Sequence, residues 1–408
     1  MKIWFINHYA VPPQYYPLAR PSLFAKNLIK MGHDVTIIAA STVHNSASKN
    51  LIETKERVRE ENFDGIPYVL INCTPYQGNG LKRVANILEF AYKLPKVLNR
   101  LPKPDAIIAT SFDPISCYAG VKYAKRCGIK CIAEIADLWP ETLVAYGGLS
   151  RKNPIVKYLK NVEKRIYTQA DRIVFTMQGA YDYIIEQGWE EVVQRSKVRF
   201  INNGIDLEQF DYNREHFHIE DEDLKSTDIF KVVYTGSIRK VNNVGKLLDV
   251  AKLINNQRIR FLIWGDGEEL SQLEERIAEE NITNVLIKGR VDKKYIPYIT
   301  SLADLNIIHN NPSALFRFGI SFNKMFDYLA AGRPTLTDFP CQYNPAIEGG
   351  AGIMVEDDSA VYIAKKIDFL SYLDKDQMLI YGTSARRTAE KYDFGILTRS
   401  LLNVIEEI

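Results

Sequence analysis

The chain has 408 residues, of which 46% are hydrophobic and 25% are charged, and its formal net charge is +2. These values are ordinary for a globular protein, and the near-neutral total excludes a dominant basic surface for nucleic acid. The length exceeds what one hydrophobic core serves, so we expect two domains of roughly 200 residues each. Five cysteines without a repeated spacing, no leader-like start and no run of about 18 apolar residues favour a cytoplasmic protein that does not span a membrane.

Short apolar runs alternate with helical patterns through the first half of the chain. Strands are predicted at residues 2–6, 35–39, 67–72, 106–109, 130–134, 172–176 and 198–201, and helices at 20–31 and 81–98. Apolar strands separated by helices are typical of a parallel sheet that is covered on both faces. The first half therefore predicts one doubly wound α/β domain.

The segment 209–229 interrupts this alternation because it is rich in Asp, Glu and His and poor in aliphatic residues. We predict a first domain at 1–208, an interdomain linker at 209–229, a second domain at 230–390 and a final helix at 391–408 that packs back on the first domain. In the second domain, strands are predicted at 231–235, 259–264, 285–288, 305–308 and from Pro334 onward, and helices at 244–254, 268–280 and 327–331. Two Rossmann-like domains facing across a cleft are the predicted fold, and ligands of such sheets bind beyond the carboxyl ends of the strands.

A glycine turn follows the predicted strand at 231–235. Gly236 allows the backbone to approach a ligand closely, and Ser237 stands beside it. Arg239 and Lys240 add positive charge just before the next helix, whose N-terminal N–H groups would face the same space. This combination favours a phosphate or diphosphate. An ordinary turn with solvated basic residues is the alternative.

Two further glycine turns follow predicted strands. Gly265-Asp-Gly267 resembles the start of a dinucleotide fingerprint, but Leu270 stands where the third glycine would be, so a tight strand-to-helix turn is predicted instead. Gly289 and Arg290 end the predicted strand at 285–288. Their backbone would frame a flat ligand, or they form a plain loop.

The most informative stretch begins at Gly319 and places Asn323, Lys324 and Asp327 near a predicted helix start at Phe322. Lys324 and the N–H groups of the first helical turn would attract an anion. Asp327, an acceptor when ionised, would suit two vicinal ribose hydroxyls. The alternative is an acidic residue that favours the helix dipole beside a solvated lysine.

In the first half, Glu134 and the segment Asp137-Leu-Trp-Pro-Glu-Thr142 lie at the end of a predicted strand. Glu134 and Asp137 would then lie near the cleft, and Trp139 offers an aromatic face to a sugar ring. A helix cap is the alternative role for Asp137.

In this order, the pieces resemble GT-B retaining glycosyltransferases of glycosyltransferase family 4, in particular bacterial surface-polysaccharide enzymes similar to fucosamine transferases. The resemblance also includes His8-Tyr-Ala10 with Arg20, Gly32-His-Asp-Val-Thr-Ile37, Ala170-Asp-Arg-Ile-Val174 and Asn202-Asn-Gly-Ile-Asp206. It implies a nucleotide-sugar donor, UDP-linked, and a glycan acceptor carried on polyprenyl diphosphate, in capsule, exopolysaccharide or O-antigen synthesis. It implies neither a cofactor nor a metal in the site.

The resemblance also implies roles for individual residues. Lys240 would contact the diphosphate and assist the reaction, Asp327 would hold the ribose, and Asp137 would lie in the reacting centre. The remaining donor-side candidates are Gly236, Ser237, Arg239, Gly289, Arg290, Asn323 and Lys324, and the acceptor-side candidates are Arg20, Glu134 and Trp139.

Four positions depart from the family pattern. Gly319 occupies the first acidic position of the Glu-x7-Glu motif, of which Asp327 is the second. Phe322 replaces a proline, Pro17-Leu18 replaces a glycine pair, and Ala136 replaces an arginine. These departures affect the expected sugar and acceptor contacts rather than those to phosphate and ribose.

Two alternative functions accompany this interpretation, and contact with a membrane surface is a separate hypothesis. A nucleotide-sugar epimerase uses the same architecture without an acceptor, and Gly319 would also fit a catalytically degenerate sugar-nucleotide-binding protein. The segments Gly80–Leu101 and Lys152–Arg165 mix basic with apolar residues, which favours contact with an anionic inner leaflet. A packed helix with a solvated basic edge is the alternative for these segments.

Overall fold

The computed structural model describes residues 1–15, 19–44, 46, 49–52 and 56–408. The chain divides into two compact units, Met1–Asn202 with Phe394–Ile408, and Asn203–Asp393. Residues 209–229, predicted as a linker, lie in the second unit, where α7 (Leu207–His216) and α8 (Glu222–Lys225) form. Aspartates begin both helices, because Asp206 and Asp221 each accept a hydrogen bond from a backbone N–H in the first turn.

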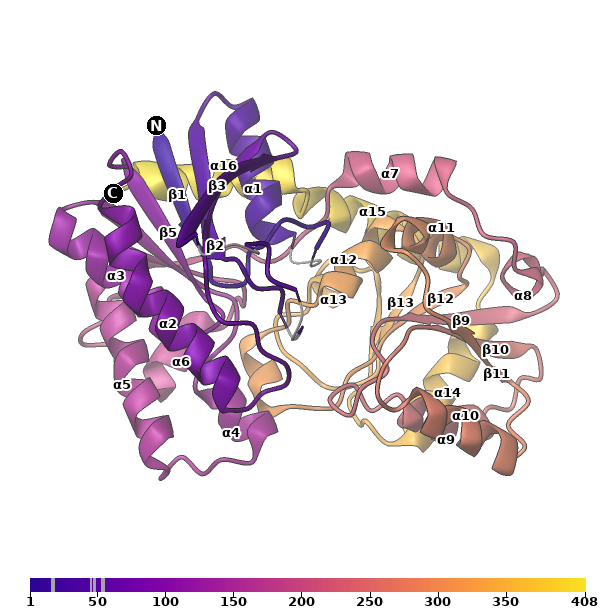
Figure 1. The fold of residues 1–408 in the computed structure, drawn as a ribbon. Coiled ribbons are helices and arrows are strands. Elements are labelled where there is room, and N and C mark those ends of the chain that lie inside the picture. Colours follow the sequence, from indigo (N-terminus) through magenta and orange to yellow (C-terminus); the bar gives the residue numbers. More distant parts are fainter. Residues whose placement is uncertain (16–18, 45, 47–48, 53–55) are drawn as a thin grey trace. The chain divides into compact units, whose positions relative to one another are not determined.

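In the described part of the chain, the first unit contains an eight-stranded sheet in the order β3-β4-β2-β1-β5-β6-β7-β8 (Figure 1). Its strands are β1 (Lys2–Ile6), β2 (Asp34–Ala40), β3 (Val58–Phe63), β4 (Ile66–Ile71), β5 (Ala106–Ser111), β6 (Lys130–Ile135), β7 (Arg172–Phe175) and β8 (Val198–Phe200). Only β3 runs antiparallel to its neighbour. The seven predicted strands are confirmed within one or two residues at each end, whereas β3 was not predicted.

Helices cover both faces of the first sheet. They are α1 (Arg20–Lys30), α2 (Leu81–Leu98), α3 (Pro114–Cys127), α4 (Glu141–Gly147), α5 (Pro154–Gln169), α6 (Ala180–Glu186) and α16 (Phe394–Glu406). On one face, α3 packs between α2 and α5, and elsewhere α1 packs on α16 (Figure 1). The rings of Phe24 and Phe394 meet edge to face at 5.3 Å, so the final helix packs on the first unit.

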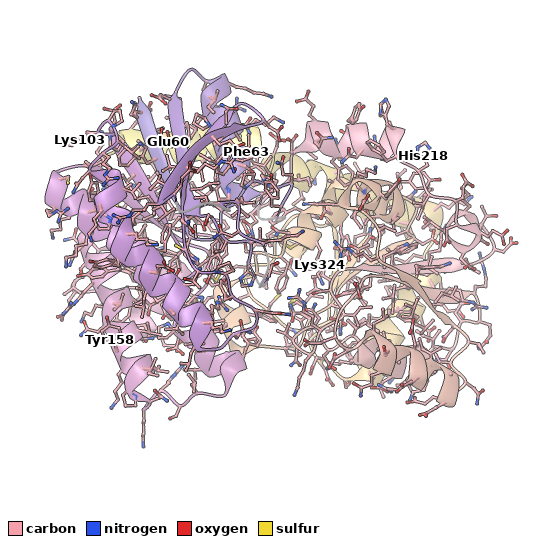
Figure 2. The ribbon with its side chains drawn as sticks, viewed as in Figure 1. Glu60, Phe63, Lys103, Tyr158, His218 and Lys324 are labelled. Carbon is pink, nitrogen blue, oxygen red and sulfur yellow. The ribbon has the colours of Figure 1, made fainter. Side chains whose placement is uncertain are left out.

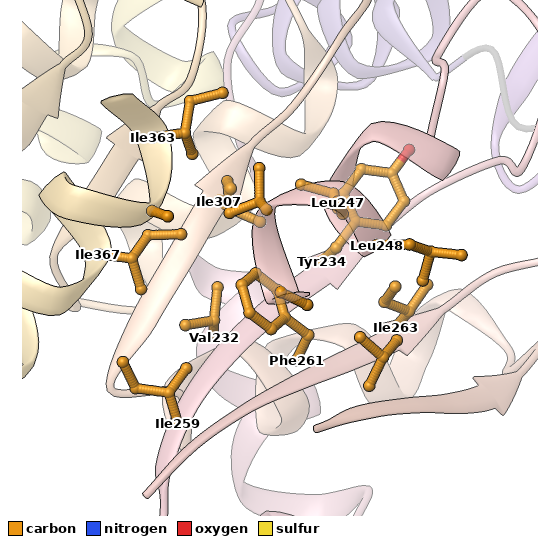
Figure 3. Packing of buried hydrophobic residues seen from close by; sticks show 14 of the residues in the cluster. Val232, Tyr234, Leu247, Leu248, Ile259, Phe261, Ile263, Ile307, Ile363 and Ile367 are labelled. Atoms are coloured by element: carbon orange, nitrogen blue, oxygen red, sulfur yellow. The ribbon is translucent and has the colours of Figure 1, made fainter. Parts of the chain in front are cut away.

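The second unit contains a parallel sheet in the order β11-β10-β9-β12-β13-β14. Its strands are β9 (Phe230–Thr235), β10 (Ile259–Trp264), β11 (Val285–Gly289), β12 (Leu305–Ile308), β13 (Thr335–Thr337) and β14 (Gly352–Met354). Figure 3 shows Val232, Phe261 and Ile307 of this sheet packed against Leu247 and Ile363 from the helices, all of them buried. This hydrophobic core holds the strands of the second sheet in place, and the loops that follow the strands lie at its edge.

The helices of the second unit include α9 (Gly245–Lys252), α10 (Leu270–Glu279), α11 (Ile296–Ser301), α12 (Asn323–Ala330), α13 (Pro345–Glu348), α14 (Ala360–Ser371) and α15 (Lys375–Lys391). The predicted start near Phe322 is confirmed, because Phe322 is the residue that precedes the first turn of α12. None of the helices in the described ranges of either unit is both long and apolar enough to cross a bilayer.

Candidate functional site

The carboxyl edge of the second sheet gathers polar residues from separate strands. Gly236 follows β9, His309 follows β12 and Asp338 follows β13, and these three strands are parallel neighbours. Residues that follow neighbouring parallel strands share one edge of the sheet, which is where ligands of such sheets bind. The order of the strands therefore places the predicted glycine turn next to two polar residues that the sequence analysis did not select.

Lys324 lies in the first turn of α12 (Figure 2), and its ammonium is close to Gly236, the residue that follows β9. Its ammonium donates to the Tyr234 hydroxyl at 3.1 Å and to the His309 carbonyl at 3.4 Å, and it lies 4.3 Å from the centre of the Tyr234 ring. Burial lowers the pKa of Lys324 to about 8, and the negative charge of Asp338 opposes this change. A cation is therefore held, incompletely solvated, above the predicted phosphate turn.

Gly236 has the geometry that this arrangement requires. Its φ angle is +156°, and a Cβ atom there would lie 3.1 Å from the Lys324 ammonium and 3.0 Å from the Tyr234 hydroxyl. Ser237 is half-buried, and its carbonyl accepts hydrogen bonds from the Tyr234 hydroxyl and the Asn242 amide. The structure thus brings three predicted donor residues together, Gly236, Ser237 and Lys324.

The remaining glycine turns pack directly on this one through backbone atoms. A Cβ on Gly265 would lie 2.0 Å from the Gly236 carbonyl oxygen, and a Cβ on Gly267 would lie 2.1 Å from that of Ile238. Hydrogen bonds from Gly236 N–H to the Trp264 carbonyl and from Gly265 N–H to the Gly289 carbonyl complete the row. The Gly-x-Gly sequence therefore serves close packing of two loops, as the predicted tight turn requires.

The helix α12 is fixed to β9 by the Tyr328 side chain, and its first turn has no side-chain cap among the described residues. The Tyr328 hydroxyl accepts a 2.8 Å hydrogen bond from the Thr235 backbone N–H, which fixes the helix to β9. Within the described ranges, the first turn receives no side-chain cap hydrogen bond, and Asn323 is exposed there. Asp327 is half-buried one turn later, and burial raises the pKa of its carboxyl while Lys293 opposes the rise. Uncapped N–H groups and Lys324 together suit an anion.

Three predicted cations lie at the surface of the second unit. Arg239 and Lys240 are exposed in the loop after β9, and Arg290 is exposed after β11. The Lys240 backbone N–H points to a Glu268 carboxylate oxygen at 3.5 Å. Their exposed side chains are therefore accessible to a ligand at the same edge of the sheet.

His309 and Asp338 are the residues that sequence reasoning missed. His309 Nδ1 lies 2.5 Å from Asp338 Oδ2, and His309 Nε2 lies 2.9 Å from the Asn243 carbonyl. Both side chains are almost fully buried. A signal was present, because each is a polar residue directly after a buried strand of a parallel sheet.

In the first unit, Arg20 and Glu134 form a buried ion pair. Arg20 Nε lies 2.9 Å from Glu134 Oε1, and the guanidinium also donates to the carbonyls of Ile201 and Asn202. Thr110 donates to the other oxygen of Glu134 at 2.9 Å. The two predicted acceptor-side residues therefore tie α1 to β6 and β5 inside the first unit.

Asp137 and Trp139 lie in the loop between β6 and α4. Asp137 is exposed and Trp139 half-buried, so both are accessible on the first unit. Asp137 does not cap α4, which begins after Pro140 without a side-chain cap. The departure at Ala136 lies in the same loop and is half-buried, whereas Pro17-Leu18 falls outside the described residues.

Gly319 has a conformation that explains part of its departure from the family pattern. Its φ angle is +108° with ψ at 170°, in the region that strongly favours glycine. A glutamate at this position would be strained in the present backbone. The backbone conformation at position 319 therefore disfavours the glutamate that the family motif has there.

Among the residues that the structure describes, metal-ligating residues and cavities outside this edge add no further part to the site. No three His, Cys, Asp or Glu side chains in the described ranges gather as a metal site would require. A cavity of about 530 Å³ lies in the first unit between α4, α5 and α6, lined in part by Lys157, Lys160 and Trp189. It contains none of the predicted site residues.

Comparisons with known proteins agree with the geometry. The family model described as Glycosyltransferase Family 4 matches residues 23–209, and the model described as Glycosyl transferases group 1 matches residues 229–371. The chain is 22% identical to WbjE of Pseudomonas aeruginosa over 72% of both chains. It is 20% identical to WcaI of Escherichia coli strain K12 over 69% of this chain and 70% of that one. Both relatives are named as glycosyltransferases, and the name of WcaI refers to colanic acid biosynthesis.

Among solved structures, HepE of Anabaena, crystallised in complex with UDP, superposes on the whole chain with a TM-score of 0.69 at 14% identity, covering 100% of both chains. At this identity the likeness establishes the fold alone, and it confirms the predicted pair of Rossmann-like domains. Together with the two family models, which match the two halves of the sequence in turn, it shows that the chain belongs to the GT-B glycosyltransferases of glycosyltransferase family 4.

Proposed function

We propose that this glycosyltransferase moves a hexose or N-acetylhexosamine from a UDP-linked donor to a glycan acceptor, with retention of configuration and without a metal. The observation that carries the proposal is the Lys324 ammonium, held at the uncapped start of α12 and 3.1 Å from where a side chain on Gly236 would begin. An anionic ligand at this edge would contact the Lys324 ammonium, the backbone N–H groups at the start of α12 and the glycine turn at Gly236.

The chemistry of transfer requires stabilisation of the departing diphosphate. Cations and helix N-termini that are fixed before the reaction supply this without reorganisation. Lys324 would hold one phosphate from the helix side, while Arg239 and Lys240 would close over the diphosphate from the loop after β9. Asn323, exposed in the first turn, would face the sugar side. In a front-face reaction the leaving diphosphate would help to deprotonate the acceptor.

The nucleoside would lie along the neighbouring strand ends. Asp327 would accept hydrogen bonds from the two ribose hydroxyls, and Gly289 and Arg290 would frame the base. The row of backbone contacts from Gly236 through Gly265 to Gly289 supports this path, because it forms a continuous surface between the phosphate turn and the end of β11. HepE, crystallised with UDP and with UDP-glucose, supports the choice of a UDP-linked donor.

The acceptor is proposed to be a growing glycan on polyprenyl diphosphate, in capsule, exopolysaccharide or O-antigen synthesis. The name of WcaI, which refers to colanic acid biosynthesis, supports this assignment. On the first unit, the exposed Asp137 would lie in the reacting centre and Trp139 would pack on a sugar ring.

A lipid-linked acceptor places the reaction at the inner leaflet, and the first unit has a surface that suits it. Gly80–Leu101 and Lys152–Arg165 each contain five Lys or Arg and one Glu, a net +4 apiece in a chain of net +2. On α2, Leu81 is 87% exposed and Tyr92 69%, and on α5 Tyr158 is 61% exposed and lies on the outer side of the helix (Figure 2). Basic and apolar groups exposed together favour anionic lipid.

The test is incubation of the intact protein with a UDP-sugar panel, first alone and then with a lipid extract that contains polyprenyl-diphosphate glycans. Transfer of the sugar to lipid, with the donor's anomeric configuration retained by NMR, is the expected result. A new nucleotide sugar from the donor alone would instead identify an epimerase. Absence of both transfer and hydrolysis, with UDP still bound, would indicate the degenerate binding protein.

A further inference from the structure

We propose that His309 and Asp338 form a buried positioning pair, which fixes the loop after β9 and the Lys324 ammonium in the arrangement that receives the donor diphosphate. The inference rests on the proposed function, because the arrangement matters only if this edge binds a nucleotide. It concerns two residues that act through others, so neither needs to touch the donor.

The first link runs from His309 to the loop. The imidazole Nε2 lies 2.9 Å from the Asn243 carbonyl, at the last residue of the turn before Val244 and α9. Asn243 has a φ of +52°, a left-handed conformation that asparagine adopts more readily than most other non-glycine residues. Its neighbour Asn242 donates to the carbonyl and the hydroxyl of Ser237. A hydrogen bond to Asn243 therefore restrains the loop that contains Ser237, Arg239 and Lys240.

The second link runs from the same residue to Lys324. The backbone carbonyl of His309 accepts a 3.4 Å hydrogen bond from the Lys324 ammonium, and the imidazole ring packs edge to face on Tyr234 at 6.1 Å. Tyr234 is the other hydrogen-bond partner of this ammonium. His309 thus contacts three groups: its imidazole Nε2 meets the loop at Asn243, its carbonyl meets the Lys324 ammonium, and its ring packs on Tyr234.

Asp338 sets the orientation of that histidine. Its Oδ2 lies 2.5 Å from His309 Nδ1, and its Oδ1 is buried with no hydrogen-bond partner among the described residues. A buried carboxylate with one unpaired oxygen is costly unless its neighbour compensates, so the pair is tightly coupled. With Nδ1 committed to Asp338, Nε2 is directed at the Asn243 carbonyl. Asp338 also favours the charged form of Lys324 through its own charge.

Substitutions of His309 separate the two contacts of the ring. His309→Gln can place an amide donor near the Nε2 position and so retain the hydrogen bond to the Asn243 carbonyl. His309→Asn can place an amide donor near the Nδ1 position, which keeps the hydrogen bond to Asp338 but loses the one to Asn243. We expect His309→Asn and Asp338→Asn to raise the Kd for UDP about fivefold to tenfold, with His309→Gln closer to the wild type. Hydrogen–deuterium exchange of backbone amides at 238–245 in the unliganded intact protein should quicken about tenfold in the same two variants.

Asp368→Asn is the matched control. Asp368 is a buried carboxylate of the same unit that accepts hydrogen bonds from Asn255 and Asn256, on an element outside the site. It should lower the melting temperature without changing UDP affinity or exchange at 238–245. The proposal is overturned if amide exchange at 238–245 in His309→Asn equals that of the wild type. It is also overturned if the UDP affinities of the two His309 variants, Asp338→Asn and Asp368→Asn simply follow their melting temperatures. His309→Gln binding UDP more weakly than His309→Asn overturns the loop route. A wild type that binds no UDP refutes the proposed function, while the exchange data still decide the role of the pair.

Discussion

Replacement of Lys324 by methionine should make the second unit more stable and the nucleotide site weaker. Methionine keeps most of the aliphatic stem and removes the ammonium. Burial lowers the pKa of this ammonium from 10.5 to about 8, which means that the folded protein disfavours the charge that a diphosphate requires. A lysine whose charge is disfavoured in the folded protein is a candidate for ligand binding.

The size of the stability effect follows from that pKa, and the size of the binding effect follows from the hydrogen bond that the ammonium would make to phosphate. One pKa unit corresponds to 1.36 kcal/mol, so the charged lysine lowers the free energy of unfolding at pH 7 by roughly 1–3 kcal/mol after allowance for its partial exposure. The unfolded chain binds the proton more tightly, so the destabilisation caused by the Lys324 charge is lost progressively as pH rises from about 8 to 10.5. The stability advantage of Lys324→Met should therefore shrink over that range. A lost charge-assisted hydrogen bond to phosphate, about 1.5–3 kcal/mol, weakens UDP binding roughly 10–100-fold at pH 7.

Calorimetric titration with UDP and thermal unfolding at pH 7 and 10 measure both quantities in one set of proteins. Lys231→Met is the matched control, because Lys231 is a buried lysine at the opposite end of β9 whose ammonium donates to the Ser226 carbonyl. It should leave UDP affinity unchanged. A Lys324→Met protein that is less stable than the wild type at pH 7 and binds UDP normally would refute the reasoning.

Three further predictions concern individual features of the site. Asp327→Asn should weaken UDP binding about tenfold in calorimetry, yet bind 2′,3′-dideoxy-UDP within about twofold of the wild type, because this ligand lacks both of the ribose hydroxyls that Asp327 would hold. Equal losses for both ligands would contradict the ribose role. Gly265→Ala should lower the free energy of unfolding of the second unit by about 1–3 kcal/mol in denaturant titration, because the new Cβ would lie 2.0 Å from the Gly236 carbonyl oxygen. An unchanged denaturant concentration at half-unfolding would contradict the loop packing. Transfer activity should survive EDTA followed by dialysis, and loss of activity that Mg²⁺ or Mn²⁺ restores would contradict a metal-independent reaction.

Much of the fold follows from local pattern because parallel strands buried on both faces are nearly continuous apolar runs. Lys2–Ile6, Ile259–Trp264 and Leu305–Ile308 have the predicted bounds for this reason. The strand β3 has the sequence VREENF, and its polar residues gave no such signal. It pairs antiparallel with β4 at the edge of the sheet, where its solvent-facing residues are polar.

Site residues could be predicted where they belong to a local turn or helix start. They could not be predicted where they depend on contacts between residues far apart in the sequence. Gly236 and Lys324 could be selected from a turn and a helix start, and the sheet brings them together. Arg20 lies 114 residues from Glu134, so no local pattern indicates that the two would satisfy each other inside the unit. His309 and Asp338 could be selected only once β12 and β13 were known to be neighbours.

The central claim is that the carboxyl edge of the second sheet binds the nucleotide of the donor. Photocrosslinking of the intact protein with 5-azido-UDP-glucose, followed by peptide mapping, tests it most directly. The account predicts label on peptides that contain Gly289 and Arg290, suppressed by excess UDP and reduced in Lys324→Met. Label that concentrates on peptides of Met1–Asn202 and is displaced by UDP would contradict it.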